Sequence, residues 1–208
     1  MRTRTPAKNH DLHGNVPDDA PVALVLIDVI NDLEFEGGDA LLQHALPMAR
    51  RLAAFKRQAR AAGVPAIYAN DNFGRWKTDF SGLVRRCTRE RVRGRPVARL
   101  LAPDHDRDYF VLKPKHSAFF ATPLETLLTY LGAKTLILTG LTGDMCVLLT
   151  AGDAFLRDFH LVVPSDCLAS IDPVENGHAL AYMKRVFDAD VRASGTLDFA
   201  HLARLRAA

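Results

Sequence analysis

The sequence predicts a three-layer α/β fold in which a parallel sheet of six strands is covered by helices on both faces. Along the 208 residues, runs rich in aliphatic and β-branched side chains alternate with amphipathic segments. The first run, Val22–Ile30 (VALVLIDVI), is apolar at every position but one, which is typical of a strand buried on both faces. Strands that alternate with helices form βαβ units, and such units build parallel sheets.

The other elements follow from local patterns. Apolar residues recur at three- and four-residue steps from Leu42 to Phe55, which predicts a helix that Gly63 ends. The motif Thr122-Pro-Leu-Glu predicts a capping box with proline at the first helical position. In chain order, the remaining expected elements are a strand at Val64–Asn70, a short helix near Phe80–Arg89, a strand at Tyr109–Pro114, a helix to Leu131, a strand at Ala133–Gly140, a helix at Asp144–Leu156, a strand at Phe159–Ser165, a helix at Pro173–Phe187 and a short sixth strand near Asp190–Ala193.

One domain accounts for most of the chain. Residues 1 to 20 are polar and rich in His, Asn, Asp and Pro, so we expect a mobile N-terminal arm, followed by a single domain over residues 21 to 208. A hydrophobic content of 48%, a charged content of 25% and a mean hydropathy of −0.03 suit a globular domain of this length.

Composition also excludes several classes of function. The net charge of +3 gives no general case for binding nucleic acid or a membrane surface. No apolar run approaches the roughly 18–20 residues of a membrane helix, and the N-terminus has no signal-peptide core. The cysteines Cys87, Cys146 and Cys167 are odd in number and widely spaced, which argues against disulfides or a zinc cluster. We therefore expect a reducing, cytoplasmic compartment.

One of these cysteines stands at a chemically distinctive place. Cys146 follows a buried-looking strand and a Thr-Gly-Leu-Thr-Gly-Asp loop, at the head of an apolar helix. The N-terminus of a helix favours negative charge, including that of a thiolate. A buried cysteine of purely structural importance is the alternative.

Three chemically complementary side chains follow three strands of the predicted sheet. Asp28 lies at the end of the first strand, Lys113 at the end of the third, and Cys146 beyond the fourth. Ligands of open α/β sheets bind at the carboxyl ends of the strands. Taken singly, each residue has an ordinary structural interpretation: Asp28 as a turn residue, Lys113 as a solvated side chain, and Cys146 as a packed core residue. Together they suit nucleophilic catalysis, in which a carboxylate takes the thiol proton and an ammonium group stabilises the charges.

The glycine-rich loop before Cys146 suits the same chemistry. Gly140 and Gly143 punctuate a loop that enters a helix, where backbone N–H groups can converge on an oxyanion. An ordinary tight turn explains the two glycines equally well, so they do not decide between these readings.

Four sequence blocks resemble the isochorismatase-like cysteine hydrolases, a family that includes nicotinamidases, N-carbamoylsarcosine amidases and ureidoacrylate amidases. The blocks are LVLIDVINDL, VLKPKHSAFFATPLETLL, LTGLTGDMCV and VVPSDCLAS with ENGHALAYM, and together they span roughly Pro21 to Ala193. The resemblance implies a sheet of Rossmann-like order, a catalytic triad of Asp28, Lys113 and Cys146, Asp144 in its usual place, and a mainly structural His178. It also implies a cis peptide between Leu141 and Thr142, which directs the Thr142 N–H to the oxyanion beside the Cys146 N–H.

Departures from the family pattern narrow the expected chemistry. Nicotinamidases carry a zinc site on an Asp-x-His arrangement after the second strand, where this chain reads NDNFGRW with Asp71 and no nearby histidine. We therefore expect no metal and no cofactor. Isochorismate hydrolases usually lack the cysteine, so Cys146 favours cleavage of a C–N bond. The glutamine common two residues after the catalytic aspartate is replaced here by Ile30.

The substrate pocket is expected to draw on the segment after the second strand. We expect a small-molecule substrate to meet side chains that follow directly on that strand, with Phe119 and His116 as weaker candidates. For Trp76, a position in the core or at a subunit interface is an equally good interpretation. The residues of this segment that we assign to the pocket are Asn72, Phe73, Arg75 and Trp76.

The arginine-rich segment from Arg85 to Arg99 has no interleaved aromatic residues, so nucleic-acid binding is disfavoured. A solvated face or a subunit contact is favoured over a substrate-binding role, and we expect a homo-oligomer (dimer or tetramer). Three functions stay open at this point: a cysteine amidohydrolase acting through a thioester, an isochorismatase-type hydrolase of a non-amide bond, and a catalytically inactive binding protein.

Overall fold

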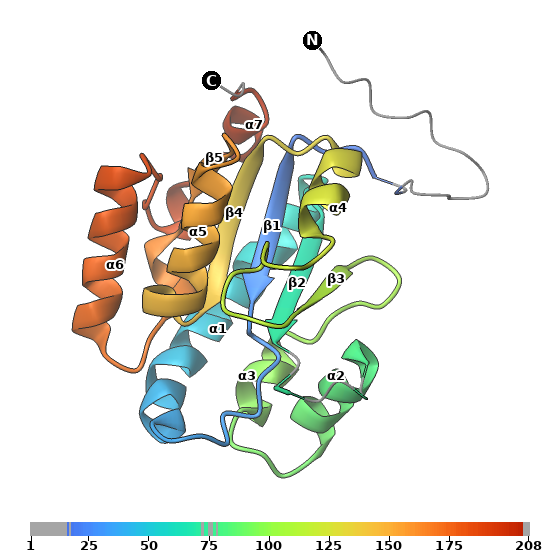
Figure 1. Ribbon diagram of the computed structural model, residues 1–208, viewed down its shortest axis with the longest axis vertical. Coiled ribbons are helices and arrows are strands. Elements are labelled where there is room, and N and C mark those ends of the chain that lie inside the picture. Colours follow the sequence, from blue (N-terminus) through green and yellow to red (C-terminus); the bar gives the residue numbers. More distant parts are fainter. Residues whose placement is uncertain (1–15, 17, 72, 75–76, 78, 206–208) are drawn as a thin grey trace.

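A computed structural model describes residues 16, 18–71, 73–74, 77 and 79–205. These residues contain one parallel β-sheet (Figure 1). The strands follow the order β3-β2-β1-β4-β5, and every pairing is parallel. A short β6 pairs with the far end of β4. The strands are β1 (Val22–Ile27), β2 (Ala66–Asp71), β3 (Tyr109–Lys113), β4 (Thr135–Leu141), β5 (His160–Val162) and β6 (Leu168–Ala169).

Helices cover both faces of this sheet (Figure 1). Along β1 the side chains alternate, so that Leu24 and Leu26 face one helical layer while Val25 and Ile27 face the other. The first layer contains α1 (Gly38–Ala61), α2 (Phe80–Arg89), α3 (Arg95–Leu100) and α7 (Phe199–Leu202); the second contains α4 (Leu124–Leu131), α5 (Leu148–Phe155) and α6 (Pro173–Val186). The predicted three-layer α/β fold with a six-stranded parallel sheet is confirmed.

The sixth strand lies elsewhere than predicted. Asp190 makes only an isolated bridge to Val162, and the Asp190 carboxylate accepts hydrogen bonds from the backbone and side chain of Arg192. This local contact turns the chain away from the sheet after a single pairing. The sixth strand is instead Leu168–Ala169, because Pro164 interrupts the run after β5 and the chain rejoins β4 beyond it.

The predicted capping box at Thr122 does not form. The helix begins at Leu124, one residue later than the motif requires. The Thr122 hydroxyl accepts a hydrogen bond from the Leu124 N–H at 3.2 Å and donates to the Ala118 carbonyl. Glu125 binds Arg157 at 2.8 Å instead of reaching back to the cap, so tertiary pairing replaced the local motif.

Part of the segment predicted to be a mobile arm contacts the domain. The Tyr109 hydroxyl donates to Asp18 at 2.6 Å, and the Ala20 N–H donates to the Leu131 carbonyl at 2.8 Å. Residues 1–15 and 17 lie outside the described part of the chain, so the arm itself stays a prediction. Among the described residues, no helix is long and apolar enough to cross a membrane.

Two backbone features set the carboxyl end of the sheet: the left-handed conformation of Asp28 and a close contact between Gly140 and Ile27. β1 ends at Ile27 because Asp28 adopts a left-handed conformation with φ of 52°, which stops the strand before the predicted Ile30. In β4, Gly140 has φ of 114°, and a Cβ atom there would lie 2.1 Å from the Ile27 carbonyl oxygen. Only glycine suits both this conformation and this contact between the two central strands.

We predict that Gly140→Ala destabilises the fold by about 2 kcal/mol or more, because the added methyl group adds a backbone clash to an unfavourable φ. Gly63→Ala is the matched control: its φ is 76°, but nothing lies within 4 Å of the added Cβ, so a loss on the order of 1 kcal/mol is expected. Urea unfolding midpoints measure both. Equal losses would mean that the contact between β1 and β4 is unimportant.

Candidate active site

The fold brings Asp28, Lys113 and Cys146 to one place. Asp28 follows β1, Lys113 is the last residue of β3, and Cys146 lies in a π-helical turn, Gly143–Val147, directly after β4. Because all of these strands run parallel, their carboxyl ends lie on the same side of the sheet, at the bottom of the view in Figure 1. Residues remote in sequence therefore become neighbours.

Lys113 lies at the centre of this cluster. Its side chain is 0% exposed, and its Nζ lies 2.8 Å from Asp28 Oδ2 and 3.8 Å from Cys146 Sγ. The Lys115 carbonyl accepts a third contact from Nζ at 3.1 Å. The other Asp28 oxygen accepts a hydrogen bond from the Asp71 N–H at 2.8 Å. The carboxylate is therefore fixed from two sides, by an ammonium group and by the end of β2.

Burial dominates the titration of these groups. It raises the pKa of the Asp28 carboxyl, although the Lys113 charge and hydrogen bonds from Lys113 and Cys146 oppose this. Burial lowers the pKa of Lys113, but the negative charges of Asp28 and Cys146 outweigh it and the net direction is upward. Burial first, and then the Asp28 charge, raise the pKa of the Cys146 thiol to about 12. Burial and the Asp28 charge therefore favour the protonated thiol over the thiolate that the helix position led us to expect.

The loop between β4 and Cys146 is shaped around the sulfur atom. The peptide bond between Leu141 and Thr142 is cis. The Thr142 backbone lowers the pKa of the Cys146 thiol, against the larger effect of burial. The Thr142 carbonyl accepts from the Met145 and Val147 N–H groups, which forms the π-helical turn.

A cavity of about 330 Å³ opens over the three residues. Phe73 lines it, whereas Asn72, Arg75 and Trp76 lie outside the described residues. The prediction for Phe119 is wrong: the side chain is 6% exposed, and it packs in the core against Phe159 and beneath the Arg157 guanidinium. The lining residues are Asp28, Asn31, Phe35, Leu41, Asp71, Phe73, His116, Leu141, Thr142, Asp144, Met145, Cys146 and Ile171.

Several wall residues were not predicted from the sequence as pocket residues. Asn31, Phe35 and Leu41 come from the loop after β1 and the start of α1, and Ile171 follows β6. Only Asn31 carried a signal, since it is a polar residue directly after a buried run. The others read as ordinary core or surface positions, because their place in the wall depends on how the loops fold.

His116 lies on the open side of the cysteine. Its Nδ1 is 3.7 Å from Cys146 Sγ, and the residue is exposed. It also borders a larger groove of about 710 Å³, whose apolar lining includes Phe120, Leu149 and Leu156. His178 is on α6, 71% exposed, with its Nδ1 3.6 Å from Glu175.

The arginine-rich segment holds the loop that carries the pocket wall. Arg86 Nε binds Asp32 at 2.9 Å, and Arg93 binds both the Leu33 carbonyl and, at 2.6 Å, Asp39. A Cβ atom on Gly94 would lie 1.9 Å from the Asn31 carbonyl oxygen, so the backbones touch there. For these two arginines, the interpretation as a solvated face is wrong, because the loop after β1 presents acidic partners for them.

The described residues contain no group of three or more His, Cys, Asp or Glu side chains arranged to hold a metal ion. None of the three cysteines forms a disulfide, and Cys87 and Cys167 are fully buried.

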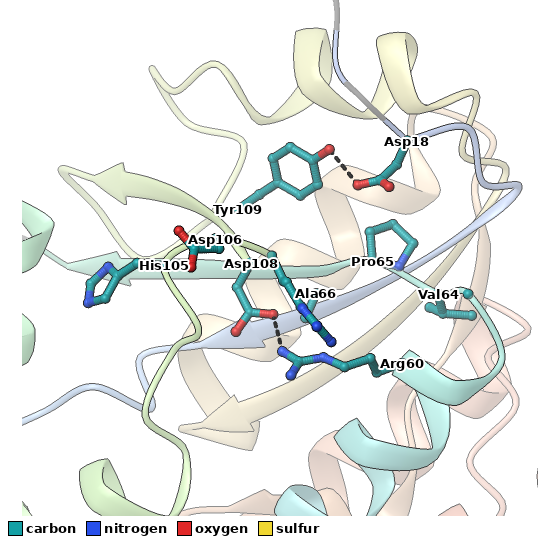
Figure 2. A pocket seen from close by; sticks show the side chains of 11 residues that line it. Asp18, Arg60, Val64, Pro65, Ala66, His105, Asp106, Asp108 and Tyr109 are labelled. Carbon is teal, nitrogen blue, oxygen red and sulfur yellow. Dashed lines mark hydrogen bonds and ion pairs between the residues drawn. The ribbon is translucent and has the colours of Figure 1, made fainter.

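A second cavity lies at the opposite, amino-terminal end of the strands (Figure 2). It measures about 550 Å³, and two polar contacts lie within its lining: Arg60 binds Asp108 at 2.9 Å, and the Tyr109 hydroxyl donates to Asp18 at 2.6 Å. These pairs join α1 and the start of β3, so this cavity carries structural contacts and is remote from Cys146.

Comparisons with known proteins point to one family. The family model for the Isochorismatase domain matches residues 22–194. The uncharacterized isochorismatase family protein YaaI of Bacillus subtilis is 40% identical over 172 residues, which are 83% of this chain and 93% of YaaI. N-carbamoylsarcosine amidase from Thermoplasma acidophilum has a crystal structure with a TM-score of 0.64 at 26% identity, covering 85% of this chain and 98% of that one. Ureidoacrylate amidohydrolase RutB of Pantoea ananatis is 27% identical over 175 residues, 73% of this chain and 70% of RutB.

The fold and these relatives define an enzyme of the hydrolase class, with amidases among its relatives. The family model spans most of the chain. The chain belongs to the isochorismatase family, and the resemblance drawn from the four sequence blocks is confirmed.

We predict that the thiol titrates as its surroundings dictate. Iodoacetamide should alkylate Cys146 slowly at pH 7 and faster as the pH rises, because the thiol pKa is raised to about 12. Asp28→Asn removes a negative charge and should lower that pKa, whereas Lys113→Met removes a positive charge and should raise it. The measurement is alkylation rate against pH, followed by mass spectrometry of the Cys146 peptide. Identical pH profiles of the alkylation rate for wild type, Asp28→Asn and Lys113→Met would contradict the charge coupling.

Proposed function

We propose that the protein is a cysteine hydrolase that cleaves a C–N bond of a small amide, ureide or carbamoyl compound through a thioester. The observation that carries this proposal is the contact of Lys113 Nζ with both Asp28 Oδ2, at 2.8 Å, and Cys146 Sγ, at 3.8 Å, beneath a cavity of molecular size. Nucleophile, base and positive charge are thus within reach of one another and of a bound substrate.

In the proposed reaction, Asp28 is the proton carrier. Its carboxylate takes the proton from Cys146 as the sulfur attacks the carbonyl carbon, and a C–S bond forms. Asp28 then gives that proton to the leaving nitrogen as the C–N bond breaks, which releases ammonia or an amine. Water attacks the thioester with Asp28 again as base, and the proton returns to the departing sulfur. The raised pKa of Asp28 suits a group that must both accept and donate a proton.

Charge stabilisation is assigned to Lys113 and to the backbone. Lys113 stays positively charged and stabilises whichever of Asp28 and Cys146 is negative. We assign the oxyanion of the tetrahedral intermediate to the Thr142 and Cys146 N–H groups. The Thr142 backbone lowers the pKa of the Cys146 thiol and lines the same cavity, which supports this assignment because the oxyanion forms on the carbon that the sulfur attacks.

Two alternatives are less well supported. An isochorismatase-type cleavage of a non-amide bond leaves the protonated thiol beside Asp28 without a role. A catalytically inactive binding protein leaves unexplained why a buried lysine and carboxylate converge on that thiol. The amidase relatives, RutB and N-carbamoylsarcosine amidase, add support for C–N cleavage.

We further propose a homo-oligomer in a reducing, cytoplasmic compartment, without a metal or other cofactor. Exposed apolar side chains around the groove beside His116 support self-association, among them Leu156 at 76% and Phe120 at 57% exposure. None of the three cysteines forms a disulfide, which suits a reducing compartment.

A screen for ammonia release over small amides, ureides and carbamoyl compounds tests the function. Each active compound is then mixed with the enzyme, quenched, and examined by intact-protein mass spectrometry. The expected result is a mass increase equal to the acyl group of the substrate, located on Cys146. Turnover of a vinyl ether without any adduct would support the isochorismatase-type alternative instead.

We predict that Cys146→Ala and Cys146→Ser reduce ammonia release below detection while leaving the denaturant unfolding midpoint nearly unchanged. The side chain is half-buried in the pocket wall, so its loss removes the nucleophile without opening the core. Cys167→Ala is the control, since that thiol is buried and does not line the cavity. Near-wild-type turnover by Cys146→Ala would rule out a thioester.

We predict that Asp28→Asn and Lys113→Met each lower turnover by roughly a hundredfold or more, the usual cost of losing a general base or a key charge. The double variant should lose far less than the product of the two single effects, because groups that act as one unit are not additive. A double-mutant cycle on turnover measures this. Independent, multiplicative losses would mean that the two residues only shape the strand ends.

A further inference from the structure

We infer that the pocket selects neutral or positively charged amides over amides that carry a carboxylate, and that Asp71 and Asp144 set this selectivity. The inference rests on the proposed function, since it concerns the substrate class of the same site. It follows from the charges that a ligand meets between the mouth of the cavity and Cys146.

Asp71 places negative charge beside the reacting residues. It is the last residue of β2, its side chain is 31% exposed, and it lines the cavity. One of its oxygens accepts a hydrogen bond from the Phe73 N–H at 2.6 Å. The other lies 4.0 Å from Lys113 Nζ, beyond the 2.8 Å at which Asp28 holds the same ammonium group. Lys113 therefore neutralises Asp28 first and Asp71 only in part.

Asp144, two residues before Cys146 in the chain, adds a second negative charge to the cavity wall. It belongs to the π-helical turn of Cys146, and its N–H donates to the Ser170 hydroxyl at 3.2 Å. Its carboxylate makes no hydrogen bond or ion pair with any residue in the described part of the chain, although it lines the cavity. A ligand is thus free to interact with it.

No accessible positive charge offsets these carboxylates among the described wall residues. Lys113 is 0% exposed, and the described lining contains no other lysine and no arginine. His116 is the only titratable nitrogen of that lining. Against the described part of the wall, a substrate carboxylate would lose its hydration and face two negative charges without a cationic partner, whereas an ammonium or amide N–H group would find acceptors.

Apart from Asn31 and Thr142, the rest of the described wall is apolar, which completes the description of the substrate class. An amide with a compact apolar body and a neutral or cationic polar group matches both parts of the cavity. The apolar lining comes from Phe35, Leu41, Phe73, Leu141, Met145 and Ile171.

Two alkylating probes of equal shape and different charge test the inference without requiring turnover. Iodoacetamide is neutral and iodoacetate is anionic, and both react with the same thiolate, so their rate ratio at Cys146 is independent of the thiol pKa. After division by the ratio for free 2-mercaptoethanol, we expect wild type to favour iodoacetamide at least tenfold. Asp71→Asn and Asp144→Asn should each lower that preference by at least about threefold, the effect of one charge roughly 6 Å away in water.

Asp106→Asn is the matched control. It also removes one negative charge, but at the amino-terminal end of the sheet, so the preference for iodoacetamide over iodoacetate should stay unchanged. The series is repeated in His116→Gln, which removes the imidazole as a source of positive charge. A corrected ratio near one in wild type would overturn the inference, and so would a ratio that neither Asp71→Asn nor Asp144→Asn changes.

Turnover gives an independent second measurement. Succinamide and succinamate differ only in replacing one amide by a carboxylate, and we expect ammonia release from succinamide to be at least tenfold faster in kcat/KM. Faster release from succinamate would overturn the inference while leaving the proposed function intact. No release from any amide in the wider screen would count against the proposed function, and the alkylation ratios would still decide the charge selectivity.

Discussion

The arrangement of this site depends on one buried charge, the Lys113 ammonium group. A fully buried lysine is stable as a cation only if an anion and further acceptors surround it. Asp28 supplies the anion and the Lys115 carbonyl a further acceptor. To reach the ammonium, Asp28 takes a left-handed backbone conformation and ends β1, and the last N–H of β2 fixes its second oxygen. One electrostatic requirement thus ties together the ends of three strands.

The same burial favours the protonated form of the Cys146 thiol over the thiolate. Under the proposed mechanism, this thiol passes its proton to Asp28 only as the sulfur attacks a carbonyl carbon. A free thiolate, by contrast, reacts with any electrophile that diffuses in. On this proposal, the reaction begins only when a substrate is bound.

The sequence was sufficient for everything that depends on strong periodicity or on strand ends. β1, α1 and the positions of Asp28, Lys113 and Cys146 follow from apolar runs and from the rule that parallel strands end together. The errors come from side-chain contacts, of which the one at Asp190 is local and the others are tertiary. Arg192 draws Asp190 out of the sheet, Arg157 draws Glu125 out of its capping box, and Phe119 finds Phe159 in the core. Asp144 and Ile171 reach the pocket through loop geometry that no local pattern records.

The two walls of the pocket differ in how firmly they are held. On one side, ion pairs of Arg86 and Arg93 and the touching backbones of Gly94 and Asn31 leave no room for larger side chains. On the other, Met145 and Ile171 are more than 40% exposed and have solvent beside them. During divergence, new substrate preferences are therefore accepted more readily at Met145 and Ile171, where a substitution displaces water, than at Asn31, where it must displace protein.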